Sequence, residues 1–528
     1  MHLSRPTLTG SLLGALFCAT PPGPATAPVP AAKPALLVFI TVDQMREDYV
    51  DRWKGQLTGG LKRLLDGGAL FTDGHQDYAI TETAPGHAST MSGRFPRSTG
   101  ITRNLAGVND PASKLIGSAN LGASPFRFRG TTLTDWLTAA NPKTRALSVS
   151  YKDRGAILPI GRSKQEVYWW GGRAYTTSTW YRDTLPSWVK AFNARHIPSD
   201  SAGKVWDLLL PAAEYAEPDS VPAESSGRSF MFPYRLSGNA DTATAQYPGF
   251  PFMDDLSAQF ALAGVTALDL GKGPETDVLA VSFSSTDLIG HRFGPDSREI
   301  HDQILRLDRT IGAFIDSLYR LRDSTTIIFA LTADHGVQPF PELNNGRITP
   351  APLRVDVNPA LVAAQKVIQA AGGNANKVDL EGGAFFVDRD SLMVKPAVLK
   401  VAVDSFVAVA RRITGVLRAD RFTDLAKADM AKDYIARRWV QMYPPDAPVV
   451  AVITLTEGSY WFNYPVAQHG TPHMQDSHVP ILFYGPPFKP GRYAGFVRTV
   501  DIAPTLARVL GVTPGEPLDG HILTVAIR

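Results

Sequence analysis

Residues 81–89 read Thr-Glu-Thr-Ala-Pro-Gly-His-Ala-Ser, and the rest of the chain is organised around this stretch. Small residues surround Thr83, and the Pro-Gly pair behind it marks the start of a short helix, which we expect at residues 86–91. A hydroxyl at such a turn, beside several backbone N–H groups, is well placed to meet an anion. The stretch therefore predicts an anion site centred on Thr83.

A buried strand precedes this turn at residues 35–42, where the sequence is continuously apolar, as in a parallel strand covered on both faces. Similar runs, alternating with helical patterns, occur at residues 146–151, 276–284, 326–332 and 479–484. This alternation predicts an α/β fold, a doubly wound and mostly parallel sheet flanked by helices. The sites of such sheets lie beyond the carboxyl ends of the strands.

Three aspartates, Asp43, Asp287 and Asp334, each follow one of these strands. Asp287 and His291 are four residues apart, so on a helical turn both side chains point the same way and can hold one cation. His469 is the third ligand that we expect for that ion, with His473 as its substitute. Asp334 and His335 can close on a second ion with Asp43 and Thr83. Two such ions about 4 Å apart suit an in-line displacement.

The expected ligands are histidines, carboxylates and a hydroxyl, without sulfur. This donor set suits zinc, with Mn, Fe or Ca as alternatives at an oxygen-richer site. Each motif alone has an ordinary structural explanation, such as a helix cap, a solvated helical pair or a turn. The prediction of a two-metal site depends on their combination in one α/β order.

The first residues differ in composition from the rest. An apolar run at residues 12–19 follows Arg5, and a Pro- and Ala-rich stretch follows the run. We expect residues 1–31 to be a signal peptide and leader, too short to span a membrane, and the protein to be periplasmic or secreted. Lipid anchoring through Cys18 is an alternative that Phe17 fits poorly. Since Cys18 is the single cysteine, cleavage would remove thiol chemistry from the mature chain.

The remaining chain, residues 32–528, is expected to form one domain with inserted cap or crown segments at about 160–250 and 340–464. The first segment is rich in aromatic residues, and it is either a surface insertion with a small core of its own or a wall over the site. The net charge of +3 and the 44% apolar content give no case for a nucleic acid partner. We expect no nucleic-acid-binding module and no transmembrane segment. The oligomeric state stays open, a monomer included.

In combination these motifs resemble the alkaline phosphatase superfamily. More closely, they resemble the bacterial secreted alkaline phosphatases with a threonine nucleophile, whose core is shared with nucleotide pyrophosphatase/phosphodiesterases. The matching segments span nearly the whole mature chain and are residues 39–43, 83–87, 287–295, 332–336, 469–472 and 500–506.

The resemblance implies that Thr83 attacks phosphorus and forms a phosphothreonine, which water then hydrolyses. It implies two Zn²⁺ ions per chain, one held near Thr83 by Asp43, Asp334 and His335, and one near the leaving group by Asp287, His291 and His469. It also assigns the other phosphoryl oxygens to Asn104, Lys152 and Arg154. We expect Lys152 and Arg154 to share one face of a strand end, where two cations would suit a monoester dianion.

The leading hypothesis is therefore a secreted phosphomonoesterase of the alkaline phosphatase type, which acts on small phosphorylated substrates. The alternative is a phosphodiesterase or nucleotide pyrophosphatase on the same core, because a diester carries one charge fewer and gains less from Lys152 and Arg154. A sulfatase is disfavoured, since its nucleophile is a Cys or Ser in another sequence context. A catalytically inactive binding protein is disfavoured by the complete set of ligands, hydroxyl and cations.

Overall fold

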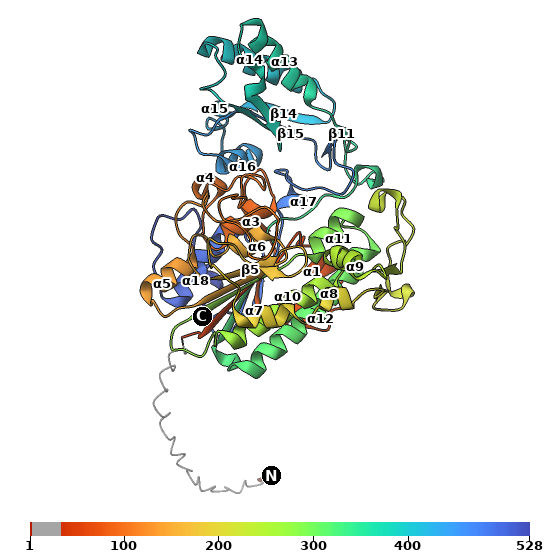
Figure 1. Cartoon of the computed structure of the whole chain (residues 1–528), viewed down its shortest axis with the longest axis vertical. Coiled ribbons are helices and arrows are strands. Elements are labelled where there is room, and N and C mark those ends of the chain that lie inside the picture. Colours follow the sequence, from red (N-terminus) through yellow and green to blue (C-terminus); the bar gives the residue numbers. More distant parts are fainter. Residues whose placement is uncertain (3–32) are drawn as a thin grey trace. The chain divides into compact units, whose positions relative to one another are not determined.

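The computed structural model describes residues 1–2 and 33–528. Cys18 and, apart from residues 1–2, the expected signal peptide and leader fall on residues 3–32, outside the described residues. The centre of the described chain is a nine-stranded sheet with helices packed on its faces (Figure 1), which confirms the expected α/β fold. Within the described part, no helix is both long enough and apolar enough to cross a bilayer.

The strands follow the order β18-β2-β17-β10-β1-β9-β4-β5-β6 across the sheet. The run from β10 to β5 is parallel, whereas β17 and β6 lie antiparallel beside it. The bounds are β1 Leu36–Val42, β2 Ala69–Phe71, β4 Ala146–Ser150, β5 Glu166–Trp170, β6 Tyr175–Thr176, β9 Asp277–Phe283, β10 Ile327–Thr332, β17 Ile481–Tyr484 and β18 Gly491–Tyr493. Because the central strands are parallel, their carboxyl ends meet at one edge.

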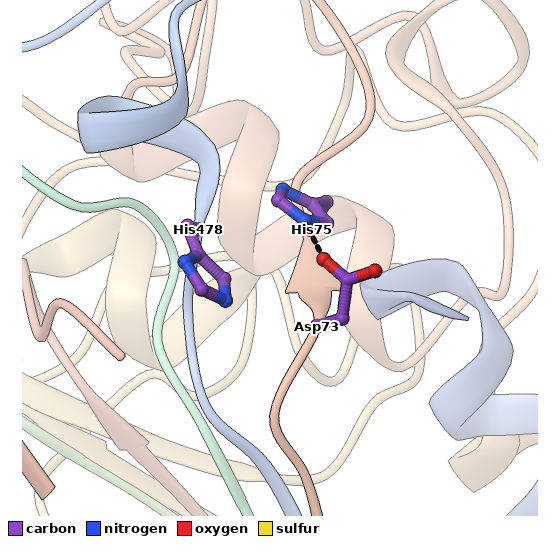
Figure 2. Close-up of side chains that lie close together, drawn as sticks. All are labelled: Asp73, His75 and His478. Atoms are coloured by element: carbon purple, nitrogen blue, oxygen red, sulfur yellow. Dashed lines mark hydrogen bonds and ion pairs between the residues drawn. The ribbon is translucent and has the colours of Figure 1, made fainter. Parts of the chain in front are cut away.

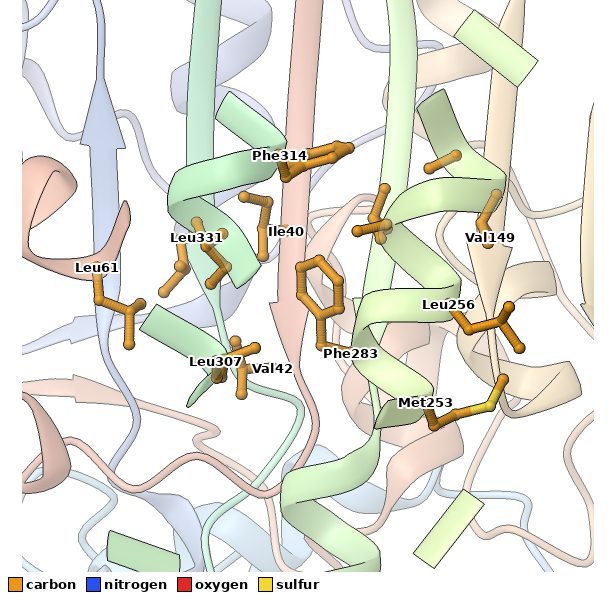
Figure 3. Packing of buried hydrophobic residues seen from close by; sticks show 14 of the residues in the cluster. Ile40, Val42, Leu61, Val149, Met253, Leu256, Phe283, Leu307, Phe314 and Leu331 are labelled. Carbon is orange, nitrogen blue, oxygen red and sulfur yellow. The ribbon is translucent and has the colours of Figure 1, made fainter. Parts of the chain in front are cut away.

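Side chains alternate between the two faces of β1, and each face has its own core. Ile40 and Val42 point to the face that carries α2 (Gly60–Gly67), α10 (Phe252–Ala267) and α12 (Arg298–Leu321), where Phe283 packs against Phe314 (Figure 3). Phe39 points to the opposite face, under α3 (Thr83–Thr90), α5 (Leu133–Ala140) and α18 (Ile502–Leu510). Covering both faces explains why β1 is apolar at every position.

The segment at residues 160–250 differs from the expected insertion. Its first part forms β5 and β6 of the main sheet, and its aromatic residues Tyr168, Trp206 and Tyr234 belong to the same core as α10 and α12. A run of consecutive aromatic residues hides the alternation that would have marked a strand. The remainder contains α7 Ser187–Asn193, α8 Ile197–Asp200, α9 Ala240–Gln246 and the short pair β7 Val205–Trp206 and β8 Tyr234–Arg235.

The segment at residues 340–464 builds a second sheet, with the antiparallel order β12-β13-β15-β14 and a core that it shares with α13 and α14. Its elements are β11 Arg354–Val355, α13 Asn358–Ala370, β12 Val378–Glu381, β13 Ala384–Val387, α14 Pro396–Ala410, β14 Val416–Arg421, α15 Phe422–Leu425, α16 Tyr434–Met442, β15 Val449–Leu455 and β16 Tyr460–Trp461. Trp439 of α16 packs in one cluster with Tyr78 and Ile80, just before the Thr83 turn. This sheet is therefore fixed to the chain that leads into the candidate site.

Candidate active site

Three buried carboxylates meet at the carboxyl edge of the central strands. Asp43 follows β1, Asp334 follows β10, and Asp287 lies in the first turn of α11 (Ser285–Phe293), directly after β9. Gln44 joins them, because its backbone N–H donates to Asp334 Oδ1 at 3.1 Å and its side-chain amide donates to Asp287 Oδ1 at 3.0 Å. Gly290 leaves room for this amide, since a Cβ there would lie 1.9 Å from Gln44 Oε1.

Three histidines surround the carboxylates. His335 Nε2 lies 3.5 Å from both Asp43 Oδ1 and Asp334 Oδ2. His291 Nε2 and His469 Nε2 lie 3.4 Å and 3.9 Å from Asp287 Oδ1. The rings of His335 and His469 stack with their centroids 3.6 Å apart. The structure thus brings together the six carboxylate and imidazole side chains that the sequence nominates.

The proton of each of these imidazoles is held on the nitrogen that faces away from the carboxylates. His291 Nδ1 donates to the Ala467 carbonyl at 2.5 Å, His335 Nδ1 to Gly336 O at 2.9 Å, and His469 Nδ1 to Thr81 O at 2.7 Å. A carbonyl oxygen only accepts, so the neutral ring keeps its lone pair on Nε2. All three lone pairs are therefore available to a metal, in the tautomer that metal-ligating histidines need.

Thr83 is the first residue of α3, so the helix begins three residues earlier than expected. Its buried hydroxyl Oγ1 lies 3.4 Å from His335 Nε2 and 3.3 Å from Lys152 Nζ. Gly86 lets the helix approach the β10 end, because a Cβ at this position would lie 2.2 Å from Asp334 O. His87 lies behind the turn and is hydrogen-bonded to Thr83 O at 3.0 Å and to Ser282 Oγ at 3.1 Å.

Lys152 is the cation nearest to these carboxylates. Its ammonium lies 2.6 Å from Asp287 Oδ2 and 2.7 Å from Asp43 Oδ2. Burial raises the pKa of Asp43 well above its usual range, and the charges of Asp287 and Asp334 add to the effect. Burial also disfavours ionised Asp334, but its contacts with His335 and His87 and the positive charge of Lys152 outweigh burial and lower its pKa. Three carboxylates against one ammonium make this a site that favours added positive charge.

These donors fit zinc. Asp43 Oδ1 is buried and accepts no hydrogen bond from the described residues, whereas Asp43 Oδ2 lies 2.7 Å from Lys152 Nζ and Asp334 Oδ2 lies 3.2 Å from His87 Nδ1. Leaving buried anionic oxygens unpaired is costly unless a cation satisfies them. The groups Asp43, Asp334, His335 and Asp287, His335, His469 each bring their ligand atoms within 4.8 Å of one another. Nitrogen and oxygen donors without sulfur suit zinc among the transition metals.

Lys152 and Arg154 do not share a strand face, so that detail of the expectation is wrong. β4 ends at Ser150, Lys152 is the N-cap of α6 (Asp153–Ile157), and Arg154 lies within the helix. Both residues lie beyond the end of β4, where the chain turns into α6. Arg154 Nη1 faces Asp153 at 3.6 Å, and its buried Nε has no partner among the described residues.

Glu82 is a site residue that sequence reasoning missed. Its Oε2 accepts the Asn104 backbone N–H at 2.7 Å, and Asn104 Oδ1 accepts the Ala84 N–H at 2.9 Å. Glu82 and Asn104 therefore form a clasp around Thr83. Burial raises the pKa of Glu82, which the Asn104 N–H and the positive charge of Arg154 partly offset. Its position directly before the threonine is the signal that could have indicated it.

The other histidines lie outside this cluster. His75 stacks on His478 with centroids 4.8 Å apart and bonds Asp73 Oδ1 at 2.8 Å (Figure 2). His473, the expected substitute for His469, is buried and bonds Leu455 O at 2.8 Å. The structure therefore places His469, and not His473, among the candidate ligands.

Comparison with known proteins shows which family the chain belongs to. Residues 37–354 match the sequence model of the type I phosphodiesterase/nucleotide pyrophosphatase family. The chain belongs to this family. Within the family it is similar to alkaline phosphatase PhoV of Synechococcus elongatus, with 31% identity over 95% of this chain and 94% of the relative. It is also similar to alkaline phosphatase PhoK of a Sphingomonas species, with 30% identity over 94% of this chain and 92% of the relative.

Solved structures agree with this assignment to the family. The crystal structure of wild-type alkaline phosphatase PafA matches with a TM-score of 0.85 and 28% identity, over 95% of this chain and all of that chain. Human ectonucleotide pyrophosphatase/phosphodiesterase 5 matches with a TM-score of 0.52 and 15% identity, over 92% of this chain and 96% of that chain, which shows a shared fold. The fold of the whole described chain, with its inserted sheet, therefore recurs in an alkaline phosphatase.

Proposed function

We propose that this protein is a secreted, metal-dependent alkaline phosphatase that hydrolyses phosphate monoesters through a phosphothreonine on Thr83. The observation that carries the proposal is the position of the Thr83 hydroxyl at the N-terminus of α3, 3.4 Å from His335 Nε2 and 3.3 Å from the Lys152 ammonium. The full-length similarity to relatives named alkaline phosphatases supports it. Residues 1–31 are the proposed export signal.

In this proposal Thr83 supplies the attacking oxygen. A bond forms between Thr83 Oγ1 and phosphorus, and the bond from phosphorus to the alcohol oxygen breaks; the alcohol leaves with the bonding pair and takes up a proton. Water then attacks phosphorus and releases phosphate and free Thr83. The positive end of α3, with the Lys152 and Arg154 cations, favours the charge on the phosphoryl oxygens. Glu82 holds the Asn104 backbone beside this position.

The residues proposed to hold two zinc ions are Asp43, Thr83, Asp334 and His335 for one, and Asp287, His291 and His469 for the other. When bound, zinc supplies Lewis acidity, which lowers the pKa of a hydroxyl or water and neutralises phosphoryl charge. The stacking of His335 on His469 brings the two ligand sets together. Phosphodiester hydrolysis is the second candidate, because the family that matches residues 37–354 is named for it.

The test is a set of assays on the purified, zinc-loaded protein. We expect phenyl phosphate to be hydrolysed with a kcat/KM well above that for diphenyl phosphate; the reverse order would favour the diesterase. Thr83→Ala should lose at least about 10³-fold in turnover while keeping the circular dichroism spectrum and the zinc content. Thr83→Ser, which keeps a hydroxyl, is the matched control and should retain measurable turnover. Full activity in Thr83→Ala would refute the nucleophile.

A further inference from the structure

A cavity of about 210 Å³ opens beside the turn between β12 and β13. Its lining includes the aromatic residues Trp461, Phe462 and Tyr464, which follow or end β16, and the apolar side chain of Leu380. Phe462 is 62% exposed and Tyr464 is 43% exposed. Neighbouring aromatic side chains left open to solvent around a cavity are typical of a binding surface.

The rim of this cavity is connected to the Thr83 turn by ion pairs and hydrogen bonds. Glu381, which lines the cavity, forms an ion pair with Arg103. Arg103 directly precedes Asn104, whose backbone donates to Glu82 and whose amide oxygen accepts from Ala84. From the cavity to the residues flanking Thr83, the connection thus passes through one ion pair and two hydrogen bonds.

Two further observations place the cavity near this turn. Gly382, in its lining, packs on the chain just before Thr83, because a Cβ there would lie 3.1 Å from Ile80 Cδ1. Burial raises the pKa of the Tyr464 hydroxyl, and the negative charges of Glu82 and Glu381 raise it further. Tyr464 therefore lies within the electrostatic reach of the carboxylate that adjoins Thr83.

We propose that this cavity is the subsite for the leaving group and that it selects phosphate monoesters of planar aromatic alcohols. The inference rests on the proposed phosphatase function. An apolar cavity of about 150 Å³ is enough to bind benzene, so the volume here accommodates one aromatic ring system, in a lining that also includes the polar residues Asp356, Asn358, Glu381 and Asn463. Phe462 and Tyr464 offer it stacking surfaces, and they lose exposed apolar area when it binds. The phosphoryl group stays at Thr83 while the ring occupies the cavity.

The test compares phenyl phosphate with methyl phosphate in the zinc-loaded, full-length protein. The double variant Phe462→Ala/Tyr464→Ala should lower kcat/KM for phenyl phosphate about tenfold, and for methyl phosphate less than about twofold. Both side chains are partly exposed, so folding should be unaffected. Met393→Ala, at another exposed apolar residue of the same insertion, is the matched control and should leave both values unchanged.

A second measurement separates binding from chemistry. Phenylphosphonate, which is not hydrolysed, should inhibit the wild type more strongly than methylphosphonate, and the double variant should remove this difference. An equal fall for both phosphate esters, or no fall for either, would overturn the subsite. If the wild type hydrolyses neither ester, the phosphatase proposal itself fails, and the phosphonates alone decide whether the cavity binds the ring.

Discussion

The Lys152 ammonium is hydrogen-bonded to the Asp287 carboxylate at 2.6 Å, closer than its 3.3 Å contact with Thr83 Oγ1. Lys152 therefore contacts a proposed metal ligand as well as the proposed nucleophile. Burial opposes its charge, but the carboxylates of Asp287 and Asp43 outweigh burial and raise its pKa. Replacing Lys152 would alter both the surroundings of the proposed metal ligands and the binding of the phosphoryl group. The substitution therefore cannot separate the two effects.

Arg154→Ala tests whether the site recognises the double negative charge of a phosphate monoester. It leaves the proposed metal ligands undisturbed, because Arg154 faces Asp153 and none of those ligands. A charge-assisted hydrogen bond contributes roughly 1.5–3 kcal/mol, so kcat/KM for phenyl phosphate should fall about 10- to 100-fold. The fall for diphenyl phosphate, with one charge fewer, should be less than about threefold. Zinc content, measured by mass spectrometry, should stay at the wild-type value. Equal losses for both substrates would contradict the role of Arg154 in recognising a dianion.

Metal removal should abolish activity and lower stability. Without a metal ion, the three carboxylates of Asp43, Asp287 and Asp334 lie together in a buried site with the Lys152 ammonium in contact with Asp43 and Asp287, and burial disfavours their ionised forms. We expect a chelator to eliminate phosphatase turnover, zinc to restore it, and the melting temperature to fall on chelation and recover with zinc. A chelated protein with unchanged activity would rule out the metal site.

Substituting His469 and His473 in turn tests which of these two nearby histidines is the metal ligand. His469 Nε2 faces Asp287, whereas His473 Nε2 is bonded to Leu455 O at 2.8 Å. His469→Ala should lower the zinc content from about two ions to about one and reduce turnover at least tenfold. His473→Ala should lower stability and leave the zinc content at two. Loss of zinc in His473→Ala but not in His469→Ala would instead make His473 the ligand.

The sequence predicts the parts of this site that follow from strand ends and local spacing. Asp43, Asp287 and Asp334 follow parallel strands, so their convergence is dictated by the sheet. Helical spacing places His291 beside Asp287. The expectations about zinc, the nucleophile and the phosphoryl ligands go further, and they stay proposals.

What the sequence could not supply depends on contacts between distant segments. The position of Glu82 beside Thr83 could have indicated it, but its contact depends on Asn104 returning to it, and nothing local predicts that return. The continuous aromatic run around Tyr168 has no alternation, so β5 was mistaken for part of an insertion. Lys152 and Arg154 do not share a strand face because the chain turns into α6 directly after β4, a boundary that the spacing alone does not fix.

Glu82→Ala and Glu82→Gln test the clasp around Thr83. Alanine removes the acceptor of the Asn104 N–H, so Asn104 should lose its fixed position and KM for phenyl phosphate should rise about tenfold. Glutamine keeps an acceptor oxygen and should recover most of this loss. The exposed Glu457→Ala is the control. If glutamine is as impaired as alanine, the charge of Glu82, and not its hydrogen bond, is what the site needs.

Asp254 should make stability depend on pH. It is buried in α10 and accepts from the Ser285 N–H at 3.1 Å and from Gln303 Nε2 at 2.8 Å, which fixes the start of α11. Burial raises its pKa from 3.8 to about 7. Between these two values the folded state binds the proton more tightly than the unfolded state, so its contribution to stability is complete below about pH 4 and is lost as the pH rises through about 7.

Asp254→Asn removes this titration. The amide can still accept from Ser285, and its NH₂ can donate to Gln303 Oε1, which has no partner among the described residues. The free energy of unfolding of the variant, relative to the wild type, should therefore increase by roughly 1–3 kcal/mol between pH 4 and pH 9, measured by urea denaturation at a fixed zinc concentration. Asp255→Asn, at the exposed neighbouring position, is the control and should show no such increase. A difference that shrinks as the pH rises would mean that Asp254 is ionised and stabilised in the folded state, and its hydrogen bonds would then outweigh its burial.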